Sequence, residues 1–359
     1  MGATSAGAGD RAGDARFRVG IAGYDLWPHA VAFCRSLRDA DFCRISDVWD
    51  DDPRKLARLV ELTGATGHAG LDAFCASGAQ GAIVTVRTDR RPAVGAALAA
   101  AGKHVLSDKP MAMDAAGCLA IIDACRTAGV VLMGGYNFRF WKVWPLMKRI
   151  LDAGELGAPV HFYCAYNTGM VPRSEWEPTY DSYWTDPQAT PGGGWLTHGD
   201  HAVDLVRWLF GCEFTEVLAD MRSLRYPQYA VEDYGVVHAL LDNSATALIH
   251  SDAIAPAARI DVEVICERGG MSYKLVPEPR LKVWGAPSLG AGVVDFALRD
   301  DWVDALGEMT RAFVHACRTG DPPPVTGEDN LRVMEVATAA YRSARESRRV
   351  AVARAPVER

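Results

Sequence analysis

Short apolar runs and amphipathic segments alternate along roughly the first 140 residues. The apolar runs predict strands over 17–22, 43–49, 82–86, 105–106 and 130–133. The segments between them carry apolar residues at helical spacing and predict helices over 29–39, 53–62, 92–101 and 115–128. Strands and helices that alternate with short connections are typical of a parallel sheet with helices on both faces. We therefore expect an α/β domain over residues 16–138, preceded by a flexible tail over residues 1–15.

The pattern changes after about residue 138. Alternating polar and apolar positions predict strands over 159–166, 216–221, 234–241, 245–251 and 261–266. Hairpin-type turns such as Asp242-Asn243-Ser244 separate them, which favours an antiparallel arrangement. Helices are expected over 144–153, 197–210, 302–319 and 328–346. The sequence thus predicts a second, α+β domain over residues 139–359 with a mostly antiparallel sheet.

Polar residues follow several predicted strands of the first domain. Asp50 comes after the second strand, Lys109 after the fourth and Asn137 after the fifth. Ligands bind beyond the carboxyl ends of parallel strands, so these side chains are expected at one site. Pro110 fixes its own φ and disfavours helical backbone at Lys109, which gives the lysine a defined direction.

Composition excludes several classes of function. The 359 residues carry a net charge of −7, so the chain lacks the basic surface of a nucleic-acid-binding protein. No apolar run reaches the ~20 residues that a membrane span needs, and the first residues do not resemble a signal peptide. The nine cysteines are dispersed and form no Cys-x-x-Cys pair, which indicates reduced thiols and a cytoplasmic location.

Two motifs are specific in combination. One is Ala101-Gly-Lys-His-Val-Leu-Ser-Asp-Lys-Pro110, and the other is Gly192-Gly-Gly-Trp-Leu-Thr-His-Gly-Asp-His-Ala-Val-Asp204 with the Trp-Leu-Phe-Gly that follows. Through them the chain, over roughly residues 16–350, resembles the glucose–fructose oxidoreductase/inositol dehydrogenase (Gfo/Idh/MocA) family. The resemblance implies a Rossmann domain that binds a nicotinamide cofactor. It also implies an open-sheet domain that often mediates oligomers, here a homodimer or homotetramer.

The chain departs from the family pattern at three places. The family's glycine-rich loop, G-x-G-x-x-G, is Gly23-Tyr-Asp25-Leu-Trp-Pro28 here and keeps only the first glycine. The family aspartate four residues before the motif histidine is Thr197. The glutamate of the family's Glu-Lys-Pro motif is Asp108.

The resemblance implies that Lys109 and His201 are catalytic. A neutral lysine can take the proton of a secondary alcohol, and burial or nearby positive charge favours its neutral form. A neutral imidazole can hydrogen-bond a substrate hydroxyl. The expected cofactor contacts are Gly23, Tyr24, Asp25, Asp50, Arg87, Asp108, Lys109 and Asn137. The expected substrate contacts are Arg139, Asn167, Trp184, Thr197 and His198.

The cofactor is expected to be NAD. An acid in the position of Asp50 binds both ribose hydroxyls of NAD and repels a 2′-phosphate, although Arg54 and Lys55 leave NADP open. A metal is not expected. His198, Asp200, His201 and Asp204 are neighbours on one predicted helix, but no matching ligand spacing is found elsewhere in the sequence.

The expected function is an oxidoreductase that acts on a secondary alcohol or carbonyl of a sugar, glycoside or cyclitol. Two alternatives stay open. One is a lyase or glycosidase that oxidises its substrate transiently with bound NAD and then eliminates. The other is a non-catalytic sugar- or nucleotide-sensing protein on the same scaffold.

Overall fold

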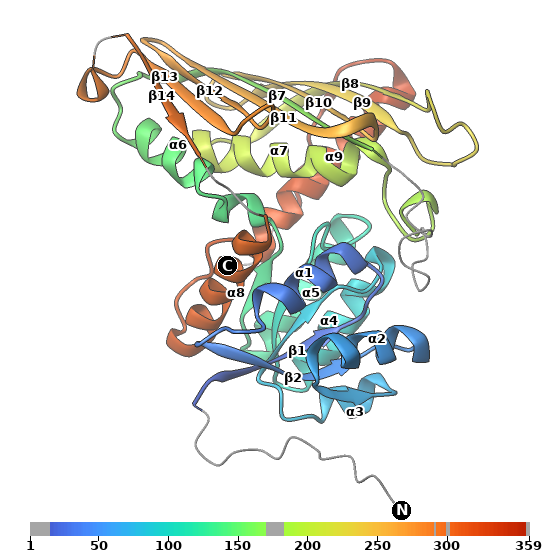
Figure 1. The fold of residues 1–359 in the computed structure, drawn as a ribbon. Helices are drawn as coiled ribbons and strands as arrows, with labels where there is room; N and C mark the ends of the chain where they lie inside the picture. Colours follow the sequence, from blue (N-terminus) through green and yellow to red (C-terminus); the bar gives the residue numbers. More distant parts are fainter. Residues whose placement is uncertain (1–14, 170–182, 291, 299–301, 357–359) are drawn as a thin grey trace, which may run out of the picture.

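A computed structural model of the protein describes residues 15–169, 183–290, 292–298 and 302–356. These residues form two sheets, one in each half of the molecule (Figure 1). Except for Ala15, the predicted tail 1–15 lies outside the described residues. Within the described ranges, no helix combines the length and apolar character needed to cross a membrane.

The first sheet has six parallel strands in the order β3-β2-β1-β4-β5-β6. Its strands are β1 (Phe17–Ala22), β2 (Cys43–Trp49), β3 (Thr66–His68), β4 (Gly81–Val84), β5 (His104–Ser107) and β6 (Leu132–Gly134). The helices between them are α1 (Trp27–Ser36), α2 (Pro53–Thr63), α3 (Leu71–Cys75), α4 (Arg91–Ala100) and α5 (Ala115–Ala128). This order is that of a Rossmann fold, as the sequence predicted.

Local signals in the sequence fix the ends of these helices. The Asp52 carboxylate accepts a hydrogen bond from the Arg54 amide at the start of α2, and Pro53 occupies the first turn. In the same way, Asp114 caps α5 through the Gly117 amide. Gly64 and Gly129 end the two helices in the left-handed conformation.

The second sheet has nine strands in the order β14-β13-β12-β11-β7-β10-β9-β8-β15. All neighbours are antiparallel except β7 and β10. The strands are β7 (Pro159–Gly169), β8 (Phe214–Arg222), β9 (Tyr234–Leu241), β10 (Thr246–Asp252), β11 (Ile254–Cys266), β12 (Gly270–Lys274), β13 (Arg280–Trp284), β14 (Val293–Ala297) and β15 (Val350–Ala351). Helices cover only one face of this sheet, so the expected open, mostly antiparallel sheet is confirmed (Figure 1).

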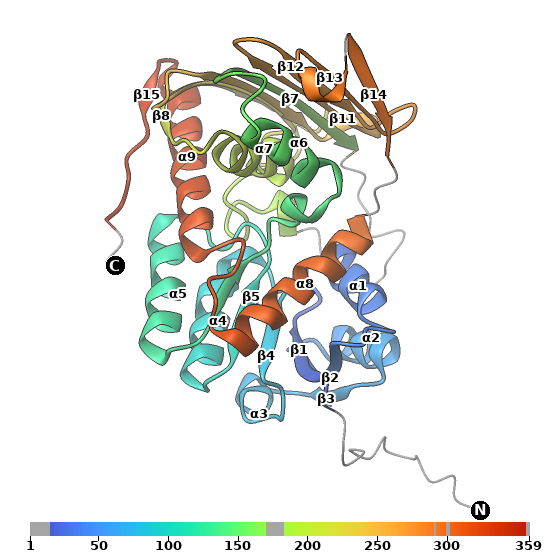
Figure 2. The same cartoon turned by 90° about the vertical axis from the view of Figure 1, so that its left-hand side faces the viewer.

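The helices of the second half are α6 (Val143–Asp152), α7 (Gly194–Phe210), α8 (Trp302–Thr319) and α9 (Gly327–Glu346). Helices α6, α7 and α9 lie under the second sheet, whereas α8 returns to the first domain and packs against α1 and β5 (Figure 2). Phe313 of α8 contacts Phe17 edge-on with ring centroids 6.4 Å apart. Helix α9 contacts both α5 and β8 and thereby joins the two halves.

Six short elements were given no range from the sequence, and several boundaries differ. Strands β3, β12, β13, β14 and β15 and helix α3 have five residues or fewer, which is too short for a clear periodic signal. Strand β11 begins at Ile254 rather than at residue 261. Helix α7 begins at Gly194 rather than near Thr197. The sequence did not predict this start because glycines disfavour helix, and tertiary contacts override that preference here.

Candidate active site

Lys109 follows β5, and hydrogen bonds of the residues next to it fix its backbone. It is only 5% exposed, and the Lys109–Pro110 peptide bond is cis. The preceding Asp108 is fully buried, and its carboxylate bonds to His29 Nδ1 at 2.9 Å and accepts the Lys109 amide at 2.8 Å. The Arg91 guanidinium donates to the carbonyl oxygens of Asp108 and Pro110. These contacts of neighbouring residues therefore fix the direction in which the Lys109 side chain leaves the backbone.

Asp108 therefore holds the Lys109 backbone in place through its carboxylate. Burial alone would raise the pKa of its carboxyl, but His29 and Arg91 outweigh burial and keep that pKa below its usual value. Asp108 was expected to contact the cofactor. In the structure both of its oxygens are directed to His29, and one of them also accepts the Lys109 amide.

Gly192 and Gly193, before α7, and Gly194, its first residue, allow that helix to begin against other parts of the second domain. A Cβ on Gly192 would lie 1.8 Å from Tyr341 Oη, and one on Gly193 would lie 2.1 Å from the Glu232 carbonyl oxygen. The buried Glu232 carboxylate then accepts the amides of Gly193 and Trp195. Any side chain at these glycines would shift α7, and the residues it carries, relative to Lys109.

Helix α7 presents two groups to Lys109. The ammonium donates to the carbonyl oxygen of Thr197, and Asp200 Oδ1 lies 3.6 Å from Nζ. Asp200 is completely buried, and burial raises the pKa of its carboxyl to about 7 against the opposing charge of Lys109. The Thr197 hydroxyl donates to the Gly193 carbonyl oxygen at 2.7 Å, so Thr197 acts on Lys109 through its backbone.

His201 is neutral in this environment. Its ring stacks on Phe138 with centroids 4.3 Å apart and meets Tyr136 edge-on at 5.7 Å. Burial lowers the pKa of His201 well below its usual value, and the charge of Lys109 lowers it further. An uncharged imidazole that is stacked in this way has a fixed orientation and can exchange a hydrogen bond with a ligand.

Unpaired polar atoms occur on α7 and on the segment after β6, where Gly135 lies against the Lys109 backbone. Within the described part of the chain, four buried atoms lack a hydrogen-bond partner here: Tyr136 Oη, Asn137 Oδ1, Asp200 Oδ2 and His201 Nδ1. Buried polar atoms are normally paired, so unpaired ones require an explanation. A polar ligand would supply the missing partners. We call Lys109, Tyr136, Asn137, Asp200 and His201 the lysine cluster.

A second group of charged residues lies at the carboxyl ends of β1 and β2. Asp25 stands in the loop after β1, and its Oδ1 is 2.8 Å from Lys55 Nζ while its Oδ2 accepts the Arg87 amide at 2.8 Å. Asp50 accepts the amides of Tyr24 and Asp52, both at 2.8 Å. Burial raises the pKa of Asp50 to about 6, and the charge of Asp25 contributes to the rise. We call Asp25, Asp50, Lys55 and Arg87 the carboxylate corner.

The carboxylate corner borders a cavity of about 400 Å³. Asp51, Asp52, Arg90 and Tyr183 complete its lining. The Arg87 side chain forms two hydrogen bonds to Asp89, so it meets Asp25 through its backbone amide only.

The cavity and the β1–α1 loop fit a dinucleotide except at the phosphate; Pro28, which replaces the third glycine, lies in the first turn of α1. Gly23 has φ +97°, and a Cβ there would lie 2.4 Å from Val86 Cγ1, so the first glycine of the loop is required. Asp50 follows β2, where an acid can bind ribose hydroxyls. Asp25 is the exception at the phosphate. It places a carboxylate at the position of the second glycine, which normally lets the backbone approach the phosphate closely. The residues present therefore fit the ribose of the cofactor, but the part of the loop that would bind its phosphates is changed by Asp25.

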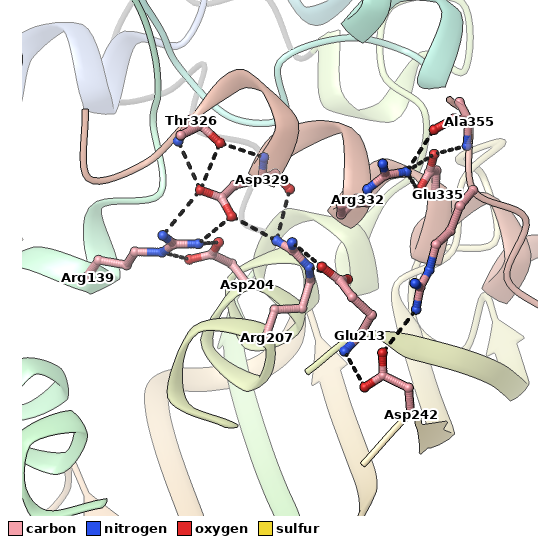
Figure 3. Close-up of polar contacts among 11 residues, drawn as sticks. Arg139, Asp204, Arg207, Glu213, Asp242, Thr326, Asp329, Arg332, Glu335 and Ala355 are labelled. Atoms are coloured by element: carbon pink, nitrogen blue, oxygen red, sulfur yellow. Dashed lines mark hydrogen bonds and ion pairs between the residues drawn. The ribbon is translucent and has the colours of Figure 1, made fainter. Parts of the chain in front are cut away.

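The Arg139 guanidinium is paired with other parts of the chain. It forms a two-pronged pair with Asp204 at 2.9 and 2.6 Å and also bonds to Asp329 (Figure 3). It further donates to the Pro324 carbonyl oxygen. Asp329 in turn pairs with Arg207. These contacts engage all three nitrogens of the guanidinium. Arg139 was expected to bind substrate, whereas in the structure it ties the turn after β6 to α7 and α9.

Asn167 is also placed differently from the expectation. Its amide donates to Asp252 on β10, whereas its neighbour Tyr166 points to α7 and packs at a tilt against His198 with ring centroids 4.2 Å apart. Successive strand residues face opposite sides of a sheet, so Asn167 lies on the face away from Lys109. His198 belongs to α7, and its Nδ1 lies 3.4 Å from the Thr168 hydroxyl oxygen. Trp184 is half-buried beside Tyr183, with their rings stacked at 6.2 Å.

Two important residues were not identified as site residues from the sequence. Asp200 lies three residues after Thr197, a spacing that places both on one helix face, and this spacing is the signal that could have found it. Lys55 had no such signal, because its partner Asp25 is 30 residues away in the sequence. Among the described residues, no group of three or more potential ligands could hold a metal ion.

Two family models match the chain. The model described as an oxidoreductase family with an NAD-binding Rossmann fold matches residues 17–136, and that of the GFO/IDH/MocA C-terminal domain matches residues 144–272. Inositol 2-dehydrogenase from Pseudomonas fluorescens is 27% identical over 299 residues, which cover 77% of this chain and 80% of that protein.

Solved structures show the same fold. An oxidoreductase domain protein from Kribbella flavida superposes with a TM-score of 0.84 at 20% identity, over 94% of this chain and 100% of that one. Levoglucosan dehydrogenase in complex with NADH superposes with a TM-score of 0.82 at 17% identity, over 95% of this chain and 100% of that one.

Proposed function

Because the chain belongs to the Gfo/Idh/MocA oxidoreductase family, we propose that it interconverts a secondary alcohol and a carbonyl on a sugar or cyclitol, with NAD as the cofactor. The single observation that carries this proposal is the lysine cluster. A buried lysine held between Thr197 and Asp200 stands beside a neutral histidine and several unpaired polar atoms. A substrate with several hydroxyl groups matches these atoms better than an apolar one does.

Each residue of the cluster has a proposed role. Lys109 takes the proton from the reacting hydroxyl, or returns it to the carbonyl in the reverse direction. The Thr197 carbonyl and Asp200 fix the position of Nζ. His201 hydrogen-bonds a hydroxyl of the substrate, because burial keeps its imidazole uncharged. Asn137 and Tyr136 offer further hydrogen bonds through the side-chain oxygens that are unpaired in the described structure.

The cofactor is held in this proposal along the carboxyl ends of the first sheet. Asp50 binds the ribose hydroxyls, Gly23 allows the close turn, and the cavity beside them takes the adenosine part. When bound, NAD supplies the hydride acceptor, a function that no protein side chain provides. Asp50 also disfavours the 2′-phosphate of NADP, so NAD is the preferred nucleotide.

The named relatives support the substrate class. One is an inositol dehydrogenase and another is a levoglucosan dehydrogenase, so both act on polyhydroxylated rings. We place the substrate between α7 and the end of β5, with His198 and Trp184 as contacts at its far side. The uncovered face of the second sheet carries half-buried Leu240 and Leu248, which suit contact with a second copy in a homodimer or homotetramer. The nine free thiols suit the reducing cytoplasm.

The test is a nucleotide titration followed by a substrate panel. NAD, NADH, NADP and NADPH are titrated into the protein, and absorbance at the NADH band is then followed with inositol isomers, aldoses and anhydrosugars. The proposal predicts tighter binding of NAD than of NADP and NADH formation with at least one cyclitol or sugar. Nucleotide binding without turnover of any panel member, in either direction, would argue against the proposed activity. Product without net NADH would favour the eliminating reaction instead.

A further inference from the structure

The loop between β1 and α1 contains a negative charge at an unusual place. In a Rossmann domain the cofactor's diphosphate lies at this loop, and the second glycine lets the backbone approach it. In this chain Asp25 occupies that second position. Its side chain is 9% exposed and pairs with Lys55, so it is not a solvated surface acid.

Asp25 is bound in the way that a phosphate oxygen would be bound. Lys55 Nζ lies 2.8 Å from one carboxylate oxygen, and the Arg87 amide donates to the other at 2.8 Å. A lysine ammonium and a backbone amide are the groups with which proteins bind phosphate. Lys55 comes from α2 and Arg87 follows β4, so two separate elements converge on this carboxylate.

Other amides of the same loop are already used by the chain. The Gly23 amide donates to the Trp49 carbonyl oxygen at 2.8 Å, and the Leu26 amide donates to the Thr85 carbonyl oxygen at 3.0 Å. The Tyr24 amide donates to the Asp50 carboxylate. In the described structure the loop therefore satisfies these donors from within.

We propose that the Asp25 carboxylate competes with the diphosphate of the dinucleotide for Lys55 and the Arg87 amide, and thereby weakens nucleotide binding. The inference rests on the proposed nucleotide-binding role of the first domain. The diphosphate must displace Asp25 from Lys55 or bind against its charge. Two like charges a few ångströms apart at a partly buried site repel strongly, because the effective dielectric constant there is well below that of water.

The experiment compares neutral and charged side chains at residue 25 by calorimetric titration of the full chain. Asp25→Asn and Asp25→Gly remove the charge, and Asp25→Glu keeps it. Asp51→Asn is the matched control, because Asp51 lines the same cavity and pairs with Arg90 but lies outside the loop. The probes are NAD, ADP and adenosine. Thermal unfolding shows whether each variant is folded, and two neutral variants are used in case one is not.

Both neutral variants are expected to bind NAD and ADP at least tenfold more tightly than the unchanged protein. Adenosine, which lacks a diphosphate, should change by less than twofold, and Asp25→Glu and Asp51→Asn should show no such gain. Equal or weaker NAD binding by the neutral variants would overturn the inference, as would an equal gain with adenosine. Failure of the proposed function would give a different result: no substrate of the panel would be turned over, while the neutral variants would still bind ADP more tightly.

Discussion

The carboxylate corner and the lysine cluster both lie at the carboxyl ends of the first sheet, and they differ in how their polar atoms are paired. In the carboxylate corner, Asp25 and Asp50 each bind donors from the chain through both oxygens. In the lysine cluster, buried atoms such as Asp200 Oδ2 and His201 Nδ1 lack partners among the described residues.

This difference indicates what a ligand must do at each place. At the lysine cluster a ligand forms hydrogen bonds with atoms that have no partner in the chain. Binding therefore breaks few existing hydrogen bonds, and little of its free energy is lost. At the carboxylate corner a ligand must replace contacts that already exist, and each replaced hydrogen bond lowers the net gain. The contacts therefore leave the lysine cluster open to a polar ligand and oppose one at the carboxylate corner.

The largest expected effect comes from removing the lysine. Lys109→Met should reduce kcat at least a thousandfold, about 4 kcal/mol of transition-state stabilisation, because the proton acceptor is lost. NAD affinity should stay within tenfold, since the carboxylate corner is unchanged. Steady-state kinetics with the best substrate of the panel, and NAD titration, measure the two quantities. Lys148→Met removes a lysine that pairs with Asp152 on α6 and serves as the control.

A parallel loss of NAD affinity and kcat would contradict the separation of the two places. It would mean that Lys109 supports the carboxylate corner as well as the chemistry.

Arg139 tests the support beneath the lysine cluster. Arg139→Leu leaves Asp204 buried without its partner, and breaking such a buried pair costs about 3 kcal/mol or more. The free energy of unfolding, from urea denaturation, should fall by that amount. Arg126→Leu, which removes an exposed pair with Asp123 on α5, should change it by about 0.5 kcal/mol or less. Equal effects of the two substitutions would show that Asp204 finds other partners.

The sequence predicted the parts of this site that depend on local pattern. Lys109, Asp50 and Asn137 follow strands whose apolar runs are clear, so their place at one edge of the sheet follows from parallel topology. His201 was identified through its motif. Both sheets and most helices were predicted for the same reason, because their periodicity extends over several residues.

The parts that were missed depend on partners far apart in the sequence. Arg139 has the charge and position of a substrate contact, but Asp204 and Asp329 lie 65 and 190 residues away and use its donors. The pairing of Asp25 with Lys55 spans 30 residues and is invisible in either segment alone. A charged residue at a strand end is therefore a reliable signal of place and a weak signal of role.

A smaller effect is expected at the glycines that position α7. Gly193→Ala places a Cβ 2.1 Å from the Glu232 carbonyl oxygen and should lower the free energy of unfolding by about 2 kcal/mol. It should also reduce kcat, because α7 carries Asp200 and His201. Gly211→Ala is the comparison: φ is +60° there but the Cβ would meet nothing within 4 Å, so about 1 kcal/mol and an unchanged kcat are expected. A normal kcat in Gly193→Ala would show that the lysine cluster tolerates a shift of α7.

The smallest effect concerns pH and compares the two places directly. Burial raises the pKa of Asp200 to about 7 and that of Asp50 to about 6, whereas an unfolded aspartate titrates near 4. The folded protein therefore binds more protons than the unfolded chain between these values, so the contribution of each carboxyl to stability falls as pH rises. For Asp200 the fall extends from about pH 4 to 7, and for Asp50 from about pH 4 to 6.

Denaturation at pH 4.5 and 7.5, for the unchanged protein and for Asp200→Asn and Asp50→Asn, measures both contributions. The stability of the unchanged protein relative to Asp200→Asn should fall by at least about 1.4 kcal/mol over this range, the equivalent of one pKa unit. The fall relative to Asp50→Asn should be smaller, because the Asp50 carboxylate keeps two amide donors and the Asp200 carboxylate keeps an unpaired oxygen. A larger fall for Asp50 would reverse the comparison and place the carboxyl with the larger pKa shift at the end of β2.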